Sequence, residues 1–209
     1  MDAAVSLLQW ARKVQAIAQN GLTFTQDPFD RERYQQLQEL VTTILTSQLA
    51  ITPEQLQGLW MGDDGYATPK IDVRGAVFDQ DKVLLVRERS DGKWTLPGGW
   101  VDVGDAPSFA VEREIREESG YLAKTVKLAA LFDKNNPAHG HPPSILHIYK
   151  LFFLCELTGG APATSNETDG VEFFPVSSLP PLSTGRATQS EIERLYQHHL
   201  NRGLPTDFD

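Results

Sequence analysis

The chain has too little of several features to belong to some common classes of protein. Its single cysteine, Cys155, can form no internal disulfide and is expected to be a small buried hydrophobe. No apolar run approaches the ~18 residues of a membrane span, and Asp2 stands where a secretion signal would carry basic residues. With 19 Lys and Arg against 28 Asp and Glu, the net charge is −9, and no basic stripe is available for nucleic acid or an anionic membrane. These absences favour a cytoplasmic protein with neither of these partners.

Residues 1–66 have the pattern of a small all-helical domain. Thr52–Gln55 has the capping-box pattern of a third, short helix, and 61–65 has the composition of a linker. Eight acidic and four basic residues in 1–66 disfavour the alternative of a helix-turn-helix DNA reader and favour packing or homodimerisation. Before Thr52, apolar residues recur at helical spacing in two stretches, namely Leu7, Trp10, Ala11, Val14 and Ile17, then Tyr34, Leu37, Val41, Ile44 and Leu45.

Residues 67–209 form the second predicted domain, where the apolar pattern changes to that of strands. Strands that flank one central and one terminal helix predict an α/β sandwich around a mixed sheet. The predicted strands lie at 71–78, 83–86, 126–132, 145–157 and 171–175, and an amphipathic closing helix lies at 188–201.

The central helix of this domain carries three carboxylates on one side. At about 100° per residue, Glu114, Glu117 and Glu118 fall within an arc of roughly 100°. Like charges at this spacing destabilise a helix, whereas a hard divalent cation would bind such oxygen ligands. The plain alternative is a solvated acidic face, which is what most such helix faces are.

The residues around this helix make a binding site the better interpretation. Asp105 is a suitable N-cap, Pro107 fits the first turn, and Gly120 stands where a left-handed C-cap is expected. Gly98 and Gly99 precede the helix in a turn that allows backbone amides to approach a phosphate closely.

The segment 98–121 resembles the signature of the Nudix hydrolases, G-x5-E-x7-R-E-U-x-E-E-x-G-U, in which U is a bulky apolar residue. Asp105 stands where the pattern has Glu, so the resemblance carries no metal or base role to that position. The resemblance implies a Nudix-type α/β/α sandwich, and Mg²⁺, with Mn²⁺ as the alternative, bound by the three helix carboxylates. The matching residues are Gly99, Arg113, Glu114, Ile115, Glu117, Glu118, Gly120 and Tyr121.

Three further residues are candidates outside this segment. Glu167 precedes the last strand, and the resemblance makes it a candidate base or metal ligand, although a solvated loop acid is the plain alternative. Arg74 and Arg87 lie on early strands, where each is a candidate phosphate clamp or an ordinary surface residue.

Two pairs of residues are expected to have other roles. His139 and His141 are not the ligands that a phosphate-bound Mg²⁺ selects, so their segment is interpreted as a flexible substrate loop. Trp94 and Trp100 flank the glycine turn and are expected to pack, with base stacking as the alternative.

The resemblance implies hydrolysis of the diphosphate bond in a nucleoside diphosphate linked to a moiety X, giving a nucleoside monophosphate and phospho-X. A helical domain ahead of the signature is similar to a bacterial subgroup that acts on ADP-ribose or CDP-choline. Pro137, 16 residues past Tyr121, has the spacing associated with ADP-ribose hydrolases, so ADP-ribose is favoured. The alternatives are an enzyme that removes unwanted nucleoside triphosphates and a protein that senses ADP-ribose without hydrolysis.

Overall fold

The computed structural model describes residues 3–48, 52, 54–56 and 65–209. The chain divides into two compact units, one comprising Met1–Pro69 with Pro143–His147, and the other Lys70–Pro142 with Ile148–Asp209. The first unit therefore includes a five-residue segment that comes from far along the sequence. None of the helices in the described ranges is long and apolar enough to cross a membrane.

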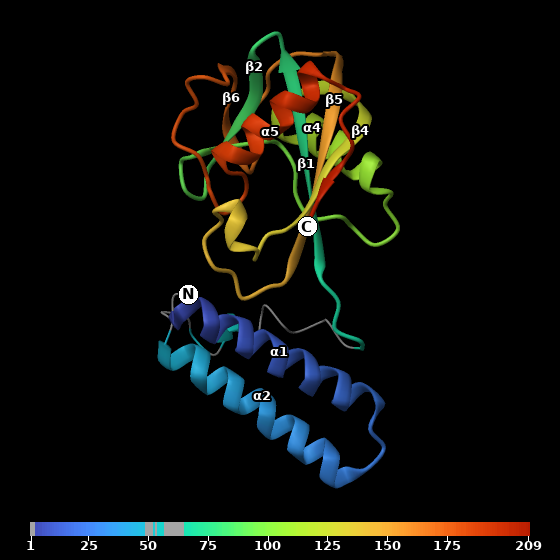
Figure 1. The fold of residues 1–209 in the computed structure, drawn as a ribbon, viewed down its shortest axis with the longest axis vertical. Coiled ribbons are helices and arrows are strands. Elements are labelled where there is room, and N and C mark those ends of the chain that lie inside the picture. Colours follow the sequence, from blue (N-terminus) through green and yellow to red (C-terminus); the bar gives the residue numbers. More distant parts are fainter. Residues whose placement is uncertain (1–2, 49–51, 53, 57–64) are drawn as a thin grey trace. The chain divides into compact units, whose positions relative to one another are not determined.

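The first unit is built on two helices, α1 (Ala3–Phe24) and α2 (Pro28–Gln48), which lie side by side in blue in Figure 1. Asp27 caps α2, because its Oδ1 accepts the backbone N–H of Phe29 at 2.8 Å and of Asp30 at 3.0 Å. The buried core of this unit consists of Leu8, Ala11, Val41, Leu45 and Leu56, with Val14 and Ile145 packed against it.

The start of the third helix is confirmed. Thr52 Oγ1 accepts the N–H of Gln55 at 3.2 Å, Gln55 Oε1 accepts the N–H of Thr52 at 2.9 Å, and residues 54–56 are helical. The predicted linker 61–65, apart from Gly65, lies outside the described residues. The stripe predicted for α1 is partly exposed, since Trp10 and Ile17 expose 64% and 59% of their surface.

The second unit is a mixed sheet with helices on both faces (Figure 1), as predicted. The strand order is β3-β2-β1-β5-β4-β7, and β6, which is outside this order, also pairs with β2. The β1–β5 and β4–β7 pairs are parallel and the others antiparallel. The strands are β1 (Lys70–Asp79), β2 (Lys82–Glu88), β3 (Trp94–Thr95), β4 (Tyr121–Asp133), β5 (Ile148–Gly160), β6 (Thr168–Pro175) and β7 (Asp207–Phe208).

Two apolar cores hold the helices to the sheet. On one face, α4 (Pro107–Ser119) buries Val111 and Ile115 against β1 and β5. On the other, α5 (Gln189–Leu200) buries Ile192 and Leu195. A short 3-10 helix, η1 (Pro137–His139), lies between β4 and β5 along the chain.

The separation of β1 from β2 creates the place where the site lies. These strands pair only at Phe78↔Val83 and Asp79↔Lys82. In the earlier part of β1, the segment 97–101 takes the place of β2: Val73 N–H donates to Gly99 O at 2.9 Å and Gly75 N–H to Pro97 O at 2.8 Å. The glycine turn is therefore part of the sheet, directly beside α4.

Most predicted elements are confirmed, although the strands predicted at 126–132 and 145–157 are observed at 121–133 and 148–160, and two further details differ. The short strands β3 and β7 were not predicted, because two residues carry no periodic pattern. The prediction that Asp105 caps α4 is wrong: Ala106 is the N-cap and makes no side-chain cap bond, while Pro107 and the left-handed Gly120 (φ 74°) are placed as predicted. The closing helix has the full capping box of Thr188 and Glu191.

The position of α4 depends on a close contact with Gly75. A Cβ on Gly75 would lie 2.6 Å from Ile115 Cδ1, so we expect Gly75→Ala to lower the free energy of unfolding by about 1–3 kcal/mol through overpacking. Ile115→Val removes that methyl group and should cost less in the Gly75→Ala background than in the wild type. Urea unfolding of the four proteins measures this coupling, and strictly additive losses would contradict it.

Candidate active site

The glycine turn and the helix carboxylates meet directly. Gly98 has φ 145°, and a Cβ there would lie 2.0 Å from Val73 O, so only glycine fits. Its N–H donates to Glu118 Oε2 at 2.8 Å. At Gly99, a Cβ would lie 3.1 Å from Glu114 Oε2. The structure therefore brings together both glycines and two of the predicted carboxylates, with the Gly98 amide bonded to Glu118.

The three helix carboxylates differ in exposure. Glu118 is buried, the Glu114 side chain is 14% exposed, and the Glu117 side chain is 51% exposed. Burial is the largest of the effects that together raise the pKa of Glu118 to about 8; Glu88 and Glu114 act in the same direction, and Arg74 and the Gly98 N–H oppose them. Burial also raises the pKa of Glu114. Two carboxylates are thus held where their charge is costly.

Arg113 lies within reach of four carboxylates at the margin of this group. Its guanidinium is 3.0 Å from Glu114, 3.5 Å from Glu117, 3.2 Å from Asp102 and 3.4 Å from Asp105. Asp105 thus pairs with Arg113, which explains why its carboxylate does not cap α4. Arg113 is placed to orient Glu114 and Glu117.

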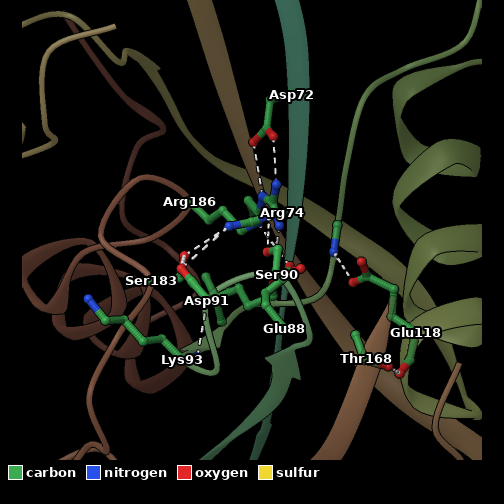
Figure 2. Close-up of polar contacts among 12 residues, drawn as sticks. Asp72, Arg74, Glu88, Ser90, Asp91, Lys93, Glu118, Thr168, Ser183 and Arg186 are labelled. Atoms are coloured by element: carbon green, nitrogen blue, oxygen red, sulfur yellow. Dashed lines mark hydrogen bonds and ion pairs between the residues drawn. The ribbon is translucent and has the colours of Figure 1, made fainter. Parts of the chain in front are cut away.

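Arg74 is a buried structural cation, whereas the plain expectation was a surface residue. Its Nε and Nη2 donate to the two Asp72 oxygens at 3.0 and 2.7 Å (Figure 2). Its Nη1 donates to Leu96 O at 3.2 Å. Lys150, which is also buried, binds Asp72. Burial alone would raise the pKa of Asp72, but Arg74 and Lys150 lower it to about 2. Arg74 therefore fixes the strand that leads into the glycine turn.

Glu88 and Arg186 belong to the cluster of charged residues around Arg74, although the sequence analysis did not select them. Glu88 is buried at the end of β2, and Arg186 Nε lies 2.9 Å from its Oε1 (Figure 2). Arg186 also donates to Ser183 Oγ at 3.0 Å and Ser90 Oγ at 3.2 Å. Burial raises the pKa of Glu88, and Glu167 is among its charged neighbours. No local pattern marks either residue, because their partners lie far away in sequence.

Glu167 interacts with the buried carboxylates, whereas Arg87 is paired with Asp169. Glu167 is exposed on the loop before β6, and its charge raises the pKa values of both Glu88 and Glu114. It therefore lies close enough to interact with the carboxylates. Arg87 pairs with Asp169 at 2.6 Å and lies over the Trp94 ring at 5.8 Å. The predicted packing role of Trp94 is confirmed by its edge contact with Phe174 at 4.7 Å.

The two histidines bind carboxylates and so anchor the loop expected to be flexible. His141 lies 2.8 Å from Glu191 Oε1 and 2.6 Å from Thr184 O, and His139 lies 2.7 Å from Asp209 Oδ1. Cys155 is buried as predicted, and burial raises the pKa of its thiol to about 12.

The residues present fit a divalent cation by their chemistry. Three carboxylates from one helix supply the oxygen ligands that Mg²⁺ prefers, and Glu118 and Glu114 are short of positive charge, as their raised pKa values show. Within the described ranges, no three His, Cys, Asp or Glu side chains already converge as a metal centre. Glu118 turns to the Gly98 N–H and Glu114 to Arg113, so a cation would compete with these donors.

Comparison with known proteins places this site in a family. Residues 68–196 match the model of the NUDIX domain, and residues 6–60 match a model described as a UDP-X-like, N-terminal oligomerisation domain. The chain therefore belongs to the Nudix hydrolases, and it is a pyrophosphohydrolase.

Three relatives cover much of the chain. A putative ADP-ribose pyrophosphatase of Bacillus subtilis is 43% identical over 97% of this chain and 96% of its own. A crystal structure of a UDP-X diphosphatase is 33% identical, the similarity covers 98% of both chains, and the TM-score is 0.63. An ADP-ribose pyrophosphatase from Streptococcus suis, 37% identical, covers 68% of this chain and 100% of its own, with a TM-score of 0.62.

The buried ion pair of Asp72 gives a prediction on pH. Asp72→Asn leaves Arg74 and Lys150 without their shared carboxylate and should lower the free energy of unfolding by about 3–5 kcal/mol near neutral pH. Because folding lowers the pKa of Asp72 from 3.8 to about 2, its ionisation adds about 2 kcal/mol of stability above pH 4. That part is lost as the pH falls from 3.8 to 2, so the difference between wild type and variant should narrow there.

Urea unfolding at pH 2–7 measures the difference, with the exposed Asp81→Asn as the control for loss of one acid. A difference that stays constant down to pH 2 would contradict the assignment.

Proposed function

We propose that the chain catalyses divalent-metal-dependent hydrolysis of the diphosphate bond in a nucleoside diphosphate linked to X, with ADP-ribose as the first candidate. The observation that carries this proposal is the contact of the glycine turn with Glu118 and Glu114, two carboxylates held in surroundings that favour added positive charge.

Each residue then has a defined task. Glu114, Glu117 and Glu118 would hold Mg²⁺ or Mn²⁺. The cation would offset the charge of the phosphoryl groups and lower the pKa of an attacking water. Arg113 keeps Glu114 and Glu117 oriented through its ion pairs. Glu167, exposed and electrostatically coupled to Glu114, is our candidate for the group that accepts the proton.

Two substrates that differ in the nucleobase and in X are supported by different relatives. The relatives from Bacillus subtilis and Streptococcus suis are named for ADP-ribose, whereas the structure similar over the full length is named for UDP-X. Both are nucleoside diphosphates with a substituent, so the same carboxylates and the same bond cleavage serve either. We place ADP-ribose first and a UDP-linked sugar second.

A substrate panel tests this proposal. ADP-ribose, a UDP-linked sugar, CDP-choline and a nucleoside triphosphate are incubated with Mg²⁺, and released nucleoside monophosphate is measured. We expect ADP-ribose or the UDP-linked sugar to give the highest kcat/KM, and EDTA to abolish turnover. Preference for the triphosphate, or full turnover in EDTA, would reject the proposal.

Neutralising Glu118 should impair catalysis without unfolding the chain. We expect Glu118→Gln to lower kcat by about 1000-fold, a change of roughly 4 kcal/mol in barrier at about 1.4 kcal/mol per decade, because a metal ligand is lost. Thermal stability should be retained, since a repelling charge is removed. Glu193→Gln on α5 is the matched control. Near wild-type turnover in Glu118→Gln would show that Glu118 is not a metal ligand needed for catalysis.

Steady-state kinetics of two variants distinguish the role of Glu167 from that of Asp105. Glu167→Gln should lower kcat by more than about tenfold with little effect on KM, while Asp105→Asn should have a small effect, because Asp105 is one of four carboxylates around Arg113. Glu172→Gln, an exposed acid on β6, controls for charge. If Glu167→Gln and Asp105→Asn have equal, small effects, Glu167 is an ordinary loop residue.

We also propose that residues 1–66 assemble two copies of the chain. Trp10, Ile17 and Phe24 expose 64%, 59% and 68% of their surface and recur every seven residues, so they form one apolar stripe on α1. Light scattering should give a dimer, and Trp10→Ser with Ile17→Ser should give a monomer. Leu200→Ser, which alters an exposed apolar residue of α5, should remain dimeric; a monomeric wild type would contradict the proposal.

A further inference from the structure

Lys134 lies on the face of the sheet that α5 covers. Its backbone N–H donates to Ile148 O at 3.0 Å and so continues the pairing of β4 with β5. In that register Phe132 is opposite Lys150, and Lys150 is opposite Asp72 of β1. Because side chains alternate between the two faces of a sheet, Lys134 shares a face with these three residues.

The ammonium of Lys134 differs from the neighbouring cations because no described residue pairs with it. Arg74 and Lys150 are bound to Asp72, and Arg186 is bound to Glu88. Lys134 is half-buried, and within the described part of the chain its ammonium makes neither a hydrogen bond nor an ion pair. Partial burial of an unpaired charge costs free energy, so this position is suited to an anion that arrives from solution.

The charges around Lys134 point to the same class of ligand. Burial lowers the pKa of Lys134, and the nearby Arg74 and Arg186 lower it further, while Asp72 and Glu191 act in the opposite direction. Cations that repel one another are stabilised together by a phosphate, which accepts several charge-assisted hydrogen bonds. Arg186 remains 33% exposed although it is paired, so it can share the same anion.

The segment that carries Lys134 is held in place at several points. Asn136 Nδ2 donates to Asp209 Oδ1 at 2.8 Å, and His139 lies 2.7 Å from the same oxygen. His141 is bound to Glu191 at 2.8 Å. A contact made from an anchored segment loses less conformational freedom on binding, which favours affinity.

We propose that Lys134 binds an anionic oxygen of the substrate's diphosphate, beside Arg186, and thereby contributes to selecting diphosphate derivatives. This inference rests on the proposed function. Arg74 interacts electrostatically with both Glu118 and Lys134. Glu114 and Glu118 lie on α4, whereas Lys134 lies on the sheet face that α5 covers, so the substrate anion would contact both groups.

Three variants of the full-length chain test the contact: Lys134→Met, Lys134→Gln and Lys134→Arg. Steady-state kinetics with ADP-ribose and calorimetric binding of inorganic pyrophosphate, both with Mg²⁺, are the two measurements. Loss of the charge should raise both KM and the pyrophosphate Kd by about 10- to 100-fold, with kcat changed much less. Lys134→Arg should recover most of the affinity. Lys82→Met, at the exposed β1–β2 turn, should match the wild type.

The two measurements distinguish failure of this contact from failure of the proposed function. If no nucleoside diphosphate derivative is hydrolysed, but pyrophosphate binding is weakened in Lys134→Met and Lys134→Gln, the anion contact stands and the proposed function falls. Unchanged KM and Kd in both folded variants would overturn the contact. So would a wild type that binds no pyrophosphate, or a fall in kcat alone.

Discussion

The buried ion pair of Asp72 and Arg74 is the interaction on which the rest of the site depends. It lies where β1 has left β2 and pairs instead with the glycine turn. Arg74 also holds Leu96 O, two residues before Gly98, whose N–H binds Glu118. A single guanidinium thus connects the sheet, the glycine turn and, through that turn, α4. The cost of burying Arg74 is offset because the carboxylate of Asp72 meets it in a bidentate geometry.

The arginines around the site offset part of the free energy cost of its buried carboxylates. Glu88 and Glu114 both repel Glu118, and burial adds to the cost of all three charges. Arg74, Arg113 and Arg186 offset only part of this cost: Arg74 is already matched by Asp72, and Arg113 is shared among four carboxylates. A cation from solution would therefore stabilise the ionised forms of these carboxylates. Strain of this kind is tolerated in a fold whose apolar cores on both faces of the sheet hold the helices independently of the site.

The sequence predicted what is local and missed what depends on the approach of distant segments. Helical spacing placed Glu114 and Glu118 on one side of α4, and the glycine pattern placed the turn beside them. The predicted N-cap was wrong because the carboxylate of Asp105 is drawn to Arg113, eight residues later, a contact that capping preferences do not include. The burial of Arg74 and the pairing of Glu88 with Arg186 follow from strand order and from where the segment before α5 returns to the sheet. No periodicity within the sequence encodes such returns.

The balance of charge around Arg74 also explains how an acidic chain can bind an anion. The net charge of −9 is spread over the whole chain, and salt screens it over about 10 Å at 0.1 M ionic strength. Local charge therefore governs binding. Arg74 interacts electrostatically with Glu118 of α4 and also with Lys134 and Lys150, which lie on the sheet face that α5 covers. A molecule that brings a cation to the carboxylates and phosphate oxygens to the lysines satisfies both. A metal-bound diphosphate has that combination of charges, whereas a neutral sugar or a nucleoside alone does not.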